Sequence, residues 1–263
     1  MKPQASSAEV QVRHLHSLEE FQVCLELQKC VWGGADIDVV PLPLFVVAAE
    51  TGGQVLGAFA GAPEPENMIG FTLAMAGVRE GIAFLHSHMT AVLEAYRDRG
   101  IGRQLKLYQR QDALGRGIGL VEWTFDPLEL KNAHFNLRRL GAIARRFLPN
   151  CYGITSSPLH GRLPTDRLVA EWWLRSARVE KLLGASGDAG RAGPGTPERK
   201  AAVRIRVPAE IGGLSRNNAE QARRVQSEIG QQFEHWFSRG YAATGIEFTA
   251  DAGEYLLEPW SAR

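Results

Sequence analysis

The sequence carries no excess charge of either sign. Its 30 Lys and Arg residues are almost balanced by 29 Asp and Glu residues, which leaves a formal net charge of +1 over 263 residues. A chain with so little net charge has no general attraction to nucleic-acid phosphates or to an anionic membrane surface. We therefore expect no nucleic-acid partner and no membrane partner.

Long apolar runs are also missing. The longest, VVPLPLFVVAA, is too short to cross a bilayer and contains two prolines. The first residues, MKPQASSAEV, lack the apolar core of a secretion signal. These two absences predict a cytoplasmic protein.

Cysteine is scarce as well, with three residues. Cys24 and Cys30 lie six residues apart on one predicted helix, a separation of nearly two turns that no disulfide spans. His86 and His88 alternate on one predicted strand, but no cysteine or acidic residue has the spacing to complete a metal site with them. We expect reduced thiols and no metal.

Periodic apolar positions predict an α/β fold with a mixed α+β sheet in residues 1–183. A capping box formed by Ser17 and Glu20 marks the start of the first helix. The predicted strands are residues 10–15, 54–61, 68–77, 83–94, 120–125 and 167–174, and the predicted helices are residues 18–32, 41–50, 102–114 and 131–140. A chain of this length forms one large domain or two small ones.

A Gly- and Pro-rich stretch at residues 184–200 predicts a linker or long loop. Residues 201–263 predict a C-terminal α+β extension. Its predicted strands at 202–208, 241–248 and 253–259 flank an amphipathic helix over 219–236.

The four letters RGIG occur twice, at residues 99–102 and 116–119. The first copy follows a predicted strand and opens a predicted helix. The first-turn N–H groups of a helix have no internal partner, and the helix dipole adds positive potential there. Glycines at Gly100 and Gly102 allow close backbone approach, and Arg97, Arg99 and Arg103 add charge. This copy predicts an anion site suited to pyrophosphate.

The second RGIG copy has the reverse context. Gly115 and Gly117 follow a predicted helix and precede a predicted strand. Glycine past a helix end is an ordinary C-terminal cap, and the negative helix end repels phosphate. The second copy therefore predicts only the end of a helix.

The first copy lies in YRDRGIGRQL, which resembles the acyl-CoA-binding motif of the GNAT acetyltransferase superfamily. That motif is Arg or Gln, two residues, Gly, one residue, then Gly or Ala, and Arg97, Gly100 and Gly102 fill it. The stretch NAHFNLRRLGA resembles the superfamily's second motif, a helix that ends in Leu-Gly-aromatic before a strand. The resemblance covers roughly the first two thirds of the chain and extends to a bacterial GNAT-like subgroup of unassigned substrate. The P-loop and dinucleotide signatures are absent from the sequence.

The resemblance implies an N-acyltransferase that uses acetyl-CoA or another acyl-CoA as co-substrate. It implies that pantetheine lies where the fourth and fifth strands splay apart, beside Ala91, Val92 and Leu93. The backbone N–H groups implied to hold the pyrophosphate are those of Arg99, Gly100, Ile101, Gly102 and Arg103. The amine of a small-molecule acceptor then attacks the thioester directly, helped by a base and an acid.

The second motif departs from the family pattern. Leu137 stands where the family's acid, a tyrosine, is usual, and Ala142 replaces the terminal aromatic. Leu130 stands in the place of the motif's asparagine. The nearby Asn132 is displaced from that place. Its side chain is either a cofactor contact or simply a helix cap. Cofactor binding is therefore better supported than chemistry, and a catalytically inactive acyl-CoA-binding or interaction module is the alternative.

Candidate catalytic residues lie elsewhere. Glu122 and Asp126 are four residues apart on a predicted strand and its end, so they share a face and are candidate bases. A solvated strand edge and an Asp-Pro turn are the respective alternatives. Tyr152 is a candidate acid or a turn tyrosine, and we expect the carboxylates to matter more. The basic cluster of Arg138, Arg139, Arg145 and Arg146 is a solvated face or meets a cofactor phosphate.

The C-terminal stretch FEHWFSRGYAATG has the same helix-Gly-aromatic ending as the second motif. It indicates a partial degenerate repeat, although shared capping chemistry explains it as well. The sequence does not identify the acceptor or the acyl length, and a homodimer is compatible with it.

Overall fold

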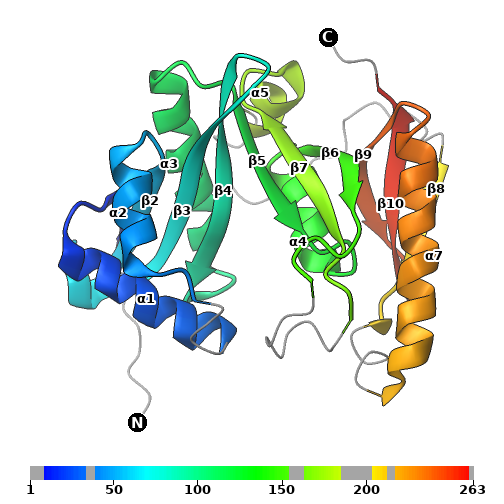
Figure 1. Ribbon diagram of the computed structural model, residues 1–263, viewed down its shortest axis with the longest axis horizontal. Helices are drawn as coiled ribbons and strands as arrows, with labels where there is room; N and C mark the ends of the chain where they lie inside the picture. The colour runs from blue at the N-terminus through cyan, green and yellow to red at the C-terminus, as the bar shows by residue number, and fades with distance from the viewer. Residues whose placement is uncertain (1–8, 34–38, 154–162, 185–202, 212–216, 261–263) are drawn as a thin grey trace. The chain divides into compact units, whose positions relative to one another are not determined.

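The computed structural model describes residues 9–33, 39–153, 163–184, 203–211 and 217–260 (Figure 1). The chain divides into two compact units, Met1–Val121 and Glu122–Arg263. The predicted α/β fold class is confirmed. The predicted domain limits, 1–183 and 201–263, stay a prediction, and residues 185–200 of the predicted linker lie outside the described residues.

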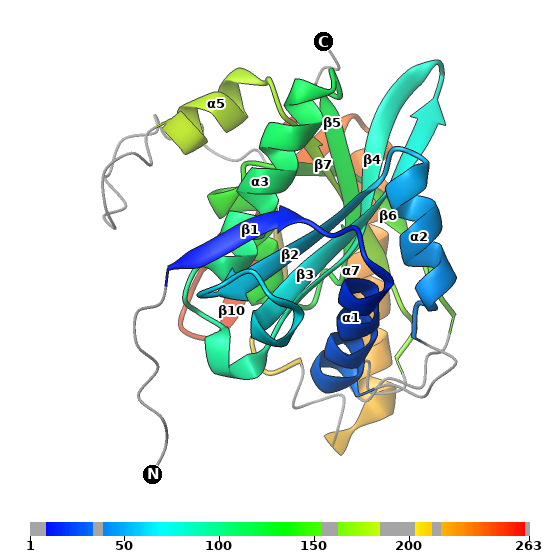
Figure 2. The same ribbon diagram turned by 90° about the vertical axis from the view of Figure 1, so that its left-hand side faces the viewer.

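The first unit is an antiparallel sheet with helices on both faces. Its strands are β1 (Val10–His14), β2 (Gln54–Ala60), β3 (Met68–Arg79) and β4 (Ile82–Val92), paired in the order β1-β2-β3-β4. Helices α1 (Leu18–Trp32) and α2 (Leu42–Glu50) lie on one face and α3 (Ile101–Gly115) on the other (Figure 2). Short 3₁₀ turns occupy Pro65–Asn67 and Glu94–Tyr96.

Strand alternation gives this sheet its two apolar layers. Val55 and Phe59 of β2 belong to the cluster that packs with α1 and α2. Leu56 and Ala58 point the other way and belong to the cluster that includes Leu105 of α3. The strand is therefore buried on both faces, by α1 and α2 on one side and by α3 on the other.

A buried lysine joins α3 to β4. The Nζ atom of Lys106 donates to Ser87 Oγ at 2.8 Å and to Gln109 Oε1 at 3.1 Å. Burial disfavours the charged amine and lowers the pKa of Lys106 from 10.5 to about 7. The contact with Ser87 holds α3 against β4, and the contact with Gln109 lies within α3.

We expect Lys106 to make the protein more stable as the pH rises from 7 toward 10. In this window the unfolded chain holds a proton on Lys106 that the folded chain has lost, so the free energy of unfolding rises by at most about 1.4 kcal/mol per pH unit. Urea denaturation of Lys106→Met should lack this slope, and Lys131→Met, at an exposed site, should keep it. Equal slopes in wild type and Lys106→Met would contradict the assignment.

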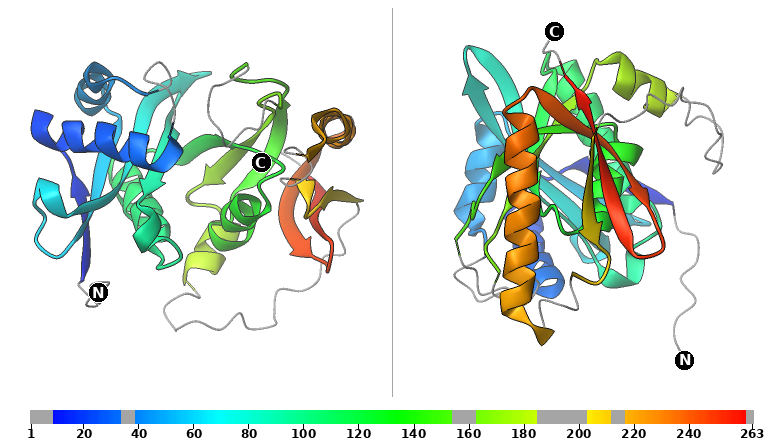
Figure 3. Two further views of the ribbon diagram at one scale, coloured as in Figure 1. Left: turned by 90° about the horizontal axis from the view of Figure 1, so that it is seen from below. Right: turned by 90° about the vertical axis from the view of Figure 1, so that its right-hand side faces the viewer.

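The second unit is a sheet in the strand order β5-β7-β6-β9-β10-β8. Its strands are β5 (Leu120–Phe125), which contains the boundary between the units, β6 (Ile143–Leu148), β7 (Arg167–Trp173), β8 (Val203–Pro208), β9 (Tyr241–Phe248) and β10 (Ala252–Pro259). Its helices are α4 (Leu130–His134), α5 (Ala177–Gly184) and α7 (Ala219–Phe237). Helix α7 packs against β6, β8 and β9 (Figure 3).

The two halves of this sheet share one connection pattern. β5, α4, β6 and β7 follow one another in the chain, and β7 lies between β5 and β6 in the sheet. β8, α7, β9 and β10 also follow one another, and β10 lies between β8 and β9. The halves meet where Ala144 of β6 pairs antiparallel with Ala243 of β9. The extension thus places its last strand between its first two, as the half before it does, but the order along the sheet is reversed. Its origin as a partial repeat stays a prediction.

The predicted element order is wrong in two places. It omits β6, where the neighbours Arg145 and Arg146 interrupt the apolar alternation, and it omits the short helix α5. A bulge in β6 accounts for the interruption, because Ala144 pairs with Ala170 and Arg146 with Val169, which leaves Arg145 as the extra residue. The predicted helix over 131–140 is α-helical to His134 and continues as a π-helical stretch over Phe135–Arg139.

No helix among the described residues is both long and apolar enough to cross a membrane. The same residues hold no group of three or more His, Cys, Asp or Glu side chains that could bind a metal ion. Cys24, Cys30 and Cys151 are free thiols. The cytoplasmic location and the lack of a nucleic-acid partner stay predictions.

Candidate active site

The first RGIG copy forms a sharp turn between β4 and α3. Asp98 has a φ of +60° and Gly100 a φ of +79°, so the chain takes the left-handed conformation twice before the helix begins. Gly100 is the N-cap of α3 and provides no side-chain cap. The N–H groups of Ile101, Gly102 and Arg103 stand in the first turn, where no intrahelical acceptor exists. The turn therefore presents backbone donors at the positive end of the helix dipole.

Space at this turn is open. A Cβ added to Gly100 or to Gly102 would meet no atom within 4 Å. Gly100 needs the left-handed conformation, whereas Gly102 has an ordinary helical φ. The two glycines therefore let a bulky anion such as pyrophosphate approach the backbone.

Arginine side chains flank the turn. The Nε atom of Arg97 donates to the carbonyl oxygen of Val92 at 3.3 Å. The guanidinium of Arg99 lies over the ring of Tyr96, 5.4 Å from its centroid. Arg103 is half-buried in the first turn of α3. These three cations favour a negatively charged ligand at the turn.

The end of β4 leads into this turn. Ala91 and Val92 pair with β3, and the Leu93 N–H donates to the carbonyl oxygen of Ile69 at 2.9 Å. Gly70 of β3 permits the pairing, because a Cβ there would lie 2.6 Å from the Ala91 carbonyl oxygen. The role of Ala91, Val92 and Leu93 beside pantetheine stays a prediction.

The second RGIG copy ends α3. Gly117 has a φ of +77°, and its N–H donates to the Leu114 carbonyl oxygen at 3.1 Å. The Ile118 N–H donates to the Ala113 carbonyl oxygen at 2.9 Å. This pair of bonds is a Schellman motif, so Gly117 acts as the predicted C-terminal cap. Gly115 is the last residue of the helix rather than a residue beyond it.

In the second unit, β5 and β7 have one apolar face and one polar face. The rings of Trp123 and Trp172 lie edge to face at 6.0 Å, and Trp172 Nε1 donates to the Leu140 carbonyl oxygen beside the π-helical stretch. The alternating neighbours Glu122 and Glu171 point the opposite way. The predicted shared face of Glu122 and Asp126 is this polar face.

Buried carboxylates on this face are paired with arginines from the β6 bulge. Arg146 lies 2.5 Å from Glu122 and 3.5 Å from Glu171, and Arg145 lies 2.5 Å from Glu171. Glu122 is only 3% exposed, so it is not the solvated strand edge that the sequence also allowed. Arg145 and Arg146 form ion pairs and are not a solvated basic face. Glu122 is therefore held as a charge partner.

Asp126 has a looser environment. Its Oδ1 atom accepts the Leu128 N–H at 2.8 Å, which makes the Asp-Pro turn, and its Oδ2 atom lies 3.6 Å from Arg167. Burial raises the pKa of the Asp126 carboxyl, against the lowering effects of the Leu128 N–H and Arg167. A carboxylate with a raised pKa and a longer ion-pair contact is a better proton acceptor than a tightly paired one.

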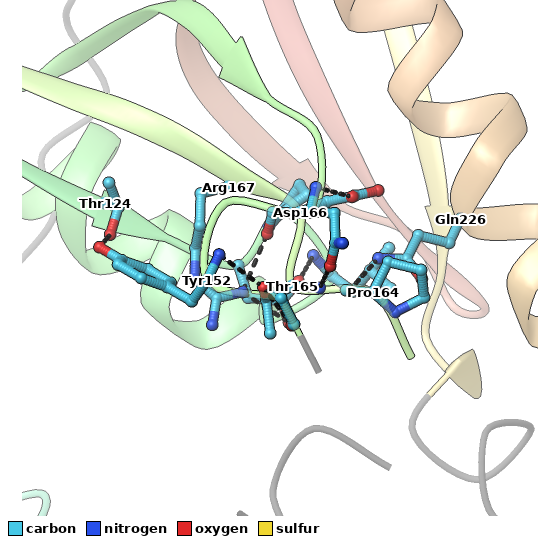
Figure 4. A network of polar contacts seen from close by, with 12 residues as sticks. Thr124, Tyr152, Pro164, Thr165, Asp166, Arg167 and Gln226 are labelled. Carbon is cyan, nitrogen blue, oxygen red and sulfur yellow. Dashed lines mark hydrogen bonds and ion pairs between the residues drawn. The ribbon is translucent and has the colours of Figure 1, made fainter. Parts of the chain in front are cut away.

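Tyr152 lies beside Asp126's partner Arg167. Its hydroxyl is 2.7 Å from Thr124 Oγ1 on β5, and its ring lies 5.6 Å from the Arg167 guanidinium (Figure 4). The residue is 47% exposed, so Tyr152 lies at an accessible edge of the polar face. Sequence reasoning missed Thr124 and Arg167. Thr124 could have been found, because it lies between Glu122 and Asp126 at the two-residue spacing that puts all three on one face of the strand.

The helix of the second motif supplies no phenol. Leu137 is buried, and Asn132 is exposed on α4. Asn136, one turn later, is buried, and its Nδ2 atom has no hydrogen-bond partner among the described residues. The Asn132 cofactor contact stays a prediction.

Comparison with solved structures identifies the fold. A protein from Desulfovibrio desulfuricans assigned to the GNAT family of acetyltransferases matches with a TM-score of 0.50 at 16% identity, over 63% of this chain and 99% of that chain. The chain has the GNAT fold. The ribosomal-protein-S18-alanine N-acetyltransferase of Escherichia coli gives a TM-score of 0.48 at 13% identity, over 64% of this chain and 96% of that chain. No protein-family model matches the sequence, and no curated protein matches it.

The GNAT fold covers only part of this chain. The matched share of 63% leaves roughly a third of the residues without a counterpart in the Desulfovibrio protein. The fold that the glycine motif implied is therefore present, together with additional structure.

Proposed function

We propose that this GNAT-fold protein transfers an acyl group, acetyl in the simplest case, from a CoA thioester to the amine of a small molecule. The observation that carries the proposal is the uncapped start of α3. There Gly100 turns the chain, Gly102 leaves the backbone open, and the first-turn N–H groups have no intrahelical partner. Such a site suits the pyrophosphate of CoA.

The chemistry needs one proton acceptor and one proton donor. The amine nitrogen attacks the thioester carbonyl carbon, the base takes a proton from that nitrogen, and the C–S bond breaks as the thiolate takes a proton. The products are an amide and free CoA thiol. We assign the base to Asp126 and the acid to Tyr152. The pKa of Asp126 is raised, and Tyr152 is an exposed residue whose hydroxyl is hydrogen-bonded to Thr124 on β5.

Charge on the polar face supports an amine acceptor. Glu122 and Glu171 are balanced by Arg145 and Arg146. Arg167 lies 3.6 Å from the Asp126 carboxylate, and its NH1 atom also donates to the backbone carbonyl oxygen of Asp166. Among the described residues, the Asp126 carboxylate has a longer contact with its arginine than Glu122 has, 3.6 Å against 2.5 Å, and such a carboxylate favours a nearby ammonium group. Whether the acceptor is free or part of a peptide is decided by the assay below.

The second candidate function is an acyl-CoA-binding module without catalysis. The buried Leu137 favours it, because the second-motif helix then offers no acid. The module shares the glycine turn with the enzyme but needs neither Asp126 nor Tyr152. The two functions therefore predict the same cofactor binding and different turnover.

Incubation of the protein with acetyl-CoA and a panel of polyamines, aminosugars, amino acids and peptides with free N-termini should release CoA thiol with at least one small amine. Mass spectrometry should find that amine heavier by one acetyl group. Stabilisation by CoA without any acetylated amine would replace the enzyme with the binding module. Acetylation of peptides alone would overturn the small-molecule acceptor.

A further inference from the structure

We propose that helix α7 of the C-terminal extension positions Tyr152, acting through Gln226 and the segment that begins at Pro164. The inference rests on the proposed function for the role of Tyr152, and on contacts within the second unit for its placement. It gives the C-terminal extension, residues 201–263, a part in the proposed site.

Two segments, residues 150–153 and 163–167, are joined around Thr165. The Thr165 carbonyl oxygen accepts the Cys151 N–H at 2.9 Å, and its Oγ1 atom accepts the Tyr152 N–H at 2.9 Å. The Thr165 hydroxyl donates to the Gly153 carbonyl oxygen at 2.8 Å, and its N–H donates to Asn150 Oδ1 at 3.3 Å (Figure 4). Thr165 is 1% exposed. The backbone of Tyr152 is therefore placed by the segment that carries Thr165.

Asp166 and Arg167 extend the same connection. The Asn150 N–H donates to Asp166 Oδ1 at 2.8 Å, which holds Asn150 at a φ of +44°. Arg167 then places its guanidinium over the Tyr152 ring. Both the backbone and the ring of Tyr152 depend on where residues 164–167 lie.

Gln226 ties this segment to α7. It is 3% exposed, and its Nε2 atom donates to the Pro164 carbonyl oxygen at 2.7 Å (Figure 4). Pro164 directly precedes Thr165. The hydrogen bond from the buried Gln226 side chain to the Pro164 carbonyl therefore links α7 to the segment that places Tyr152.

Helix α7 is itself fixed on β6, the strand before residues 150–153. Phe233 stacks with Phe147 of β6 at 6.3 Å and lies edge to face with Tyr255 of β10 at 5.1 Å. Gly230 permits close packing, because a Cβ there would lie 2.7 Å from the Phe147 ring. Helix α7 therefore contacts the chain on both sides of the Tyr152 segment. It contacts Phe147 of β6 before that segment and Pro164 after it.

Hydrogen exchange tests the placement without any acceptor. Gln226→Met keeps the side-chain volume and removes the donor, and the amides of Cys151 and Tyr152 should then exchange at least ~10-fold faster. The amides of α3 should be unchanged. Gln231→Met, at an exposed position of the same helix, is the matched control and should leave both regions as in the wild type. Wild-type exchange at Cys151 and Tyr152 in Gln226→Met would overturn the inference.

Kinetics test whether the placement serves Tyr152. With the amine identified by the panel, Gln226→Met should lower kcat ~10-fold or more and leave the KM for acetyl-CoA unchanged. The double variant with Tyr152→Phe should be no slower than Tyr152→Phe alone. Additive losses would show that Gln226 does not act through Tyr152 and would overturn that step. If the wild type acetylates nothing, the proposed function fails while the exchange measurement still decides the placement.

Discussion

Gly102→Glu is expected to abolish the stabilisation of the protein by CoA. In the wild type, CoA at about 100 times its Kd should add about 2.7 kcal/mol to the free energy of unfolding. For a chain of this size that raises the melting temperature by about 5–10 °C. The glutamate would place a side chain and a negative charge where the pyrophosphate meets the first-turn N–H groups of α3, so the shift should vanish.

The same substitution should leave the free protein intact. A Cβ on Gly102 meets no atom within 4 Å, and the residue has a helical φ. Glutamate is a better helix former than glycine, and its charge is favourable at a helix N-terminus. The melting temperature without CoA should therefore be unchanged or higher, which separates lost binding from lost folding.

Two controls lie at the other end of α3, one at the glycine just before the second RGIG copy and one within it. Gly115→Glu places the same charge in equally open space at the other end of α3 and should keep the full CoA shift. Gly117→Glu should lower the melting temperature, since φ is +77° there, but also keep the shift. Loss of the shift in either control would reverse the assignment of the two copies. A wild type that gains nothing from millimolar CoA would remove the enzyme and the binding module together.

Local signals made most of the fold predictable. The capping box is present, with Ser17 Oγ accepting the Glu20 N–H at 3.2 Å and Glu20 Oε2 accepting the Ser17 N–H at 3.0 Å. The glycine turn was predictable for the same reason, because a strand, a turn and a helix start are adjacent in sequence. β6 was missed because its bulge places two arginines side by side, and the alternation that marks a strand is lost there.

The polar face could not be predicted in detail because its partners are distant in sequence. Glu122 and Arg146 are 24 residues apart, and Thr124 and Tyr152 are 28 apart. Taken alone, each residue also fits a purely structural role, as a charged surface residue or a tyrosine in a turn. Only the pairing of β5, β6 and β7 separates a tightly paired Glu122 from a loosely paired Asp126, and so ranks the candidate bases.

Asp126→Asn should lower kcat for the identified amine by about 100-fold or more, the usual cost of removing a general base. Asparagine still accepts the Leu128 N–H, so the turn after β5 and the affinity for CoA should be unchanged. Glu122→Gln is the comparison. Glu122→Gln removes the charge that Arg146 pairs with, so it should lower the melting temperature. Arg146 still lies near Glu171, and we expect kcat to fall far less than in Asp126→Asn. Tyr152→Phe should also cost less than Asp126→Asn, because water can protonate a leaving thiolate.

The pH profile of kcat should identify Asp126 as the group that titrates. Its pKa is raised by burial, and only the ionised carboxylate accepts a proton. The wild-type kcat should therefore fall as the pH drops through this raised pKa, and Asp126→Asn should lose that acid limb and show a low, flat rate. Glu122→Gln should keep the limb. An acid limb that persists in Asp126→Asn and disappears in Glu122→Gln would move the base to Glu122, and the short contact with Arg146 would then have to open during turnover.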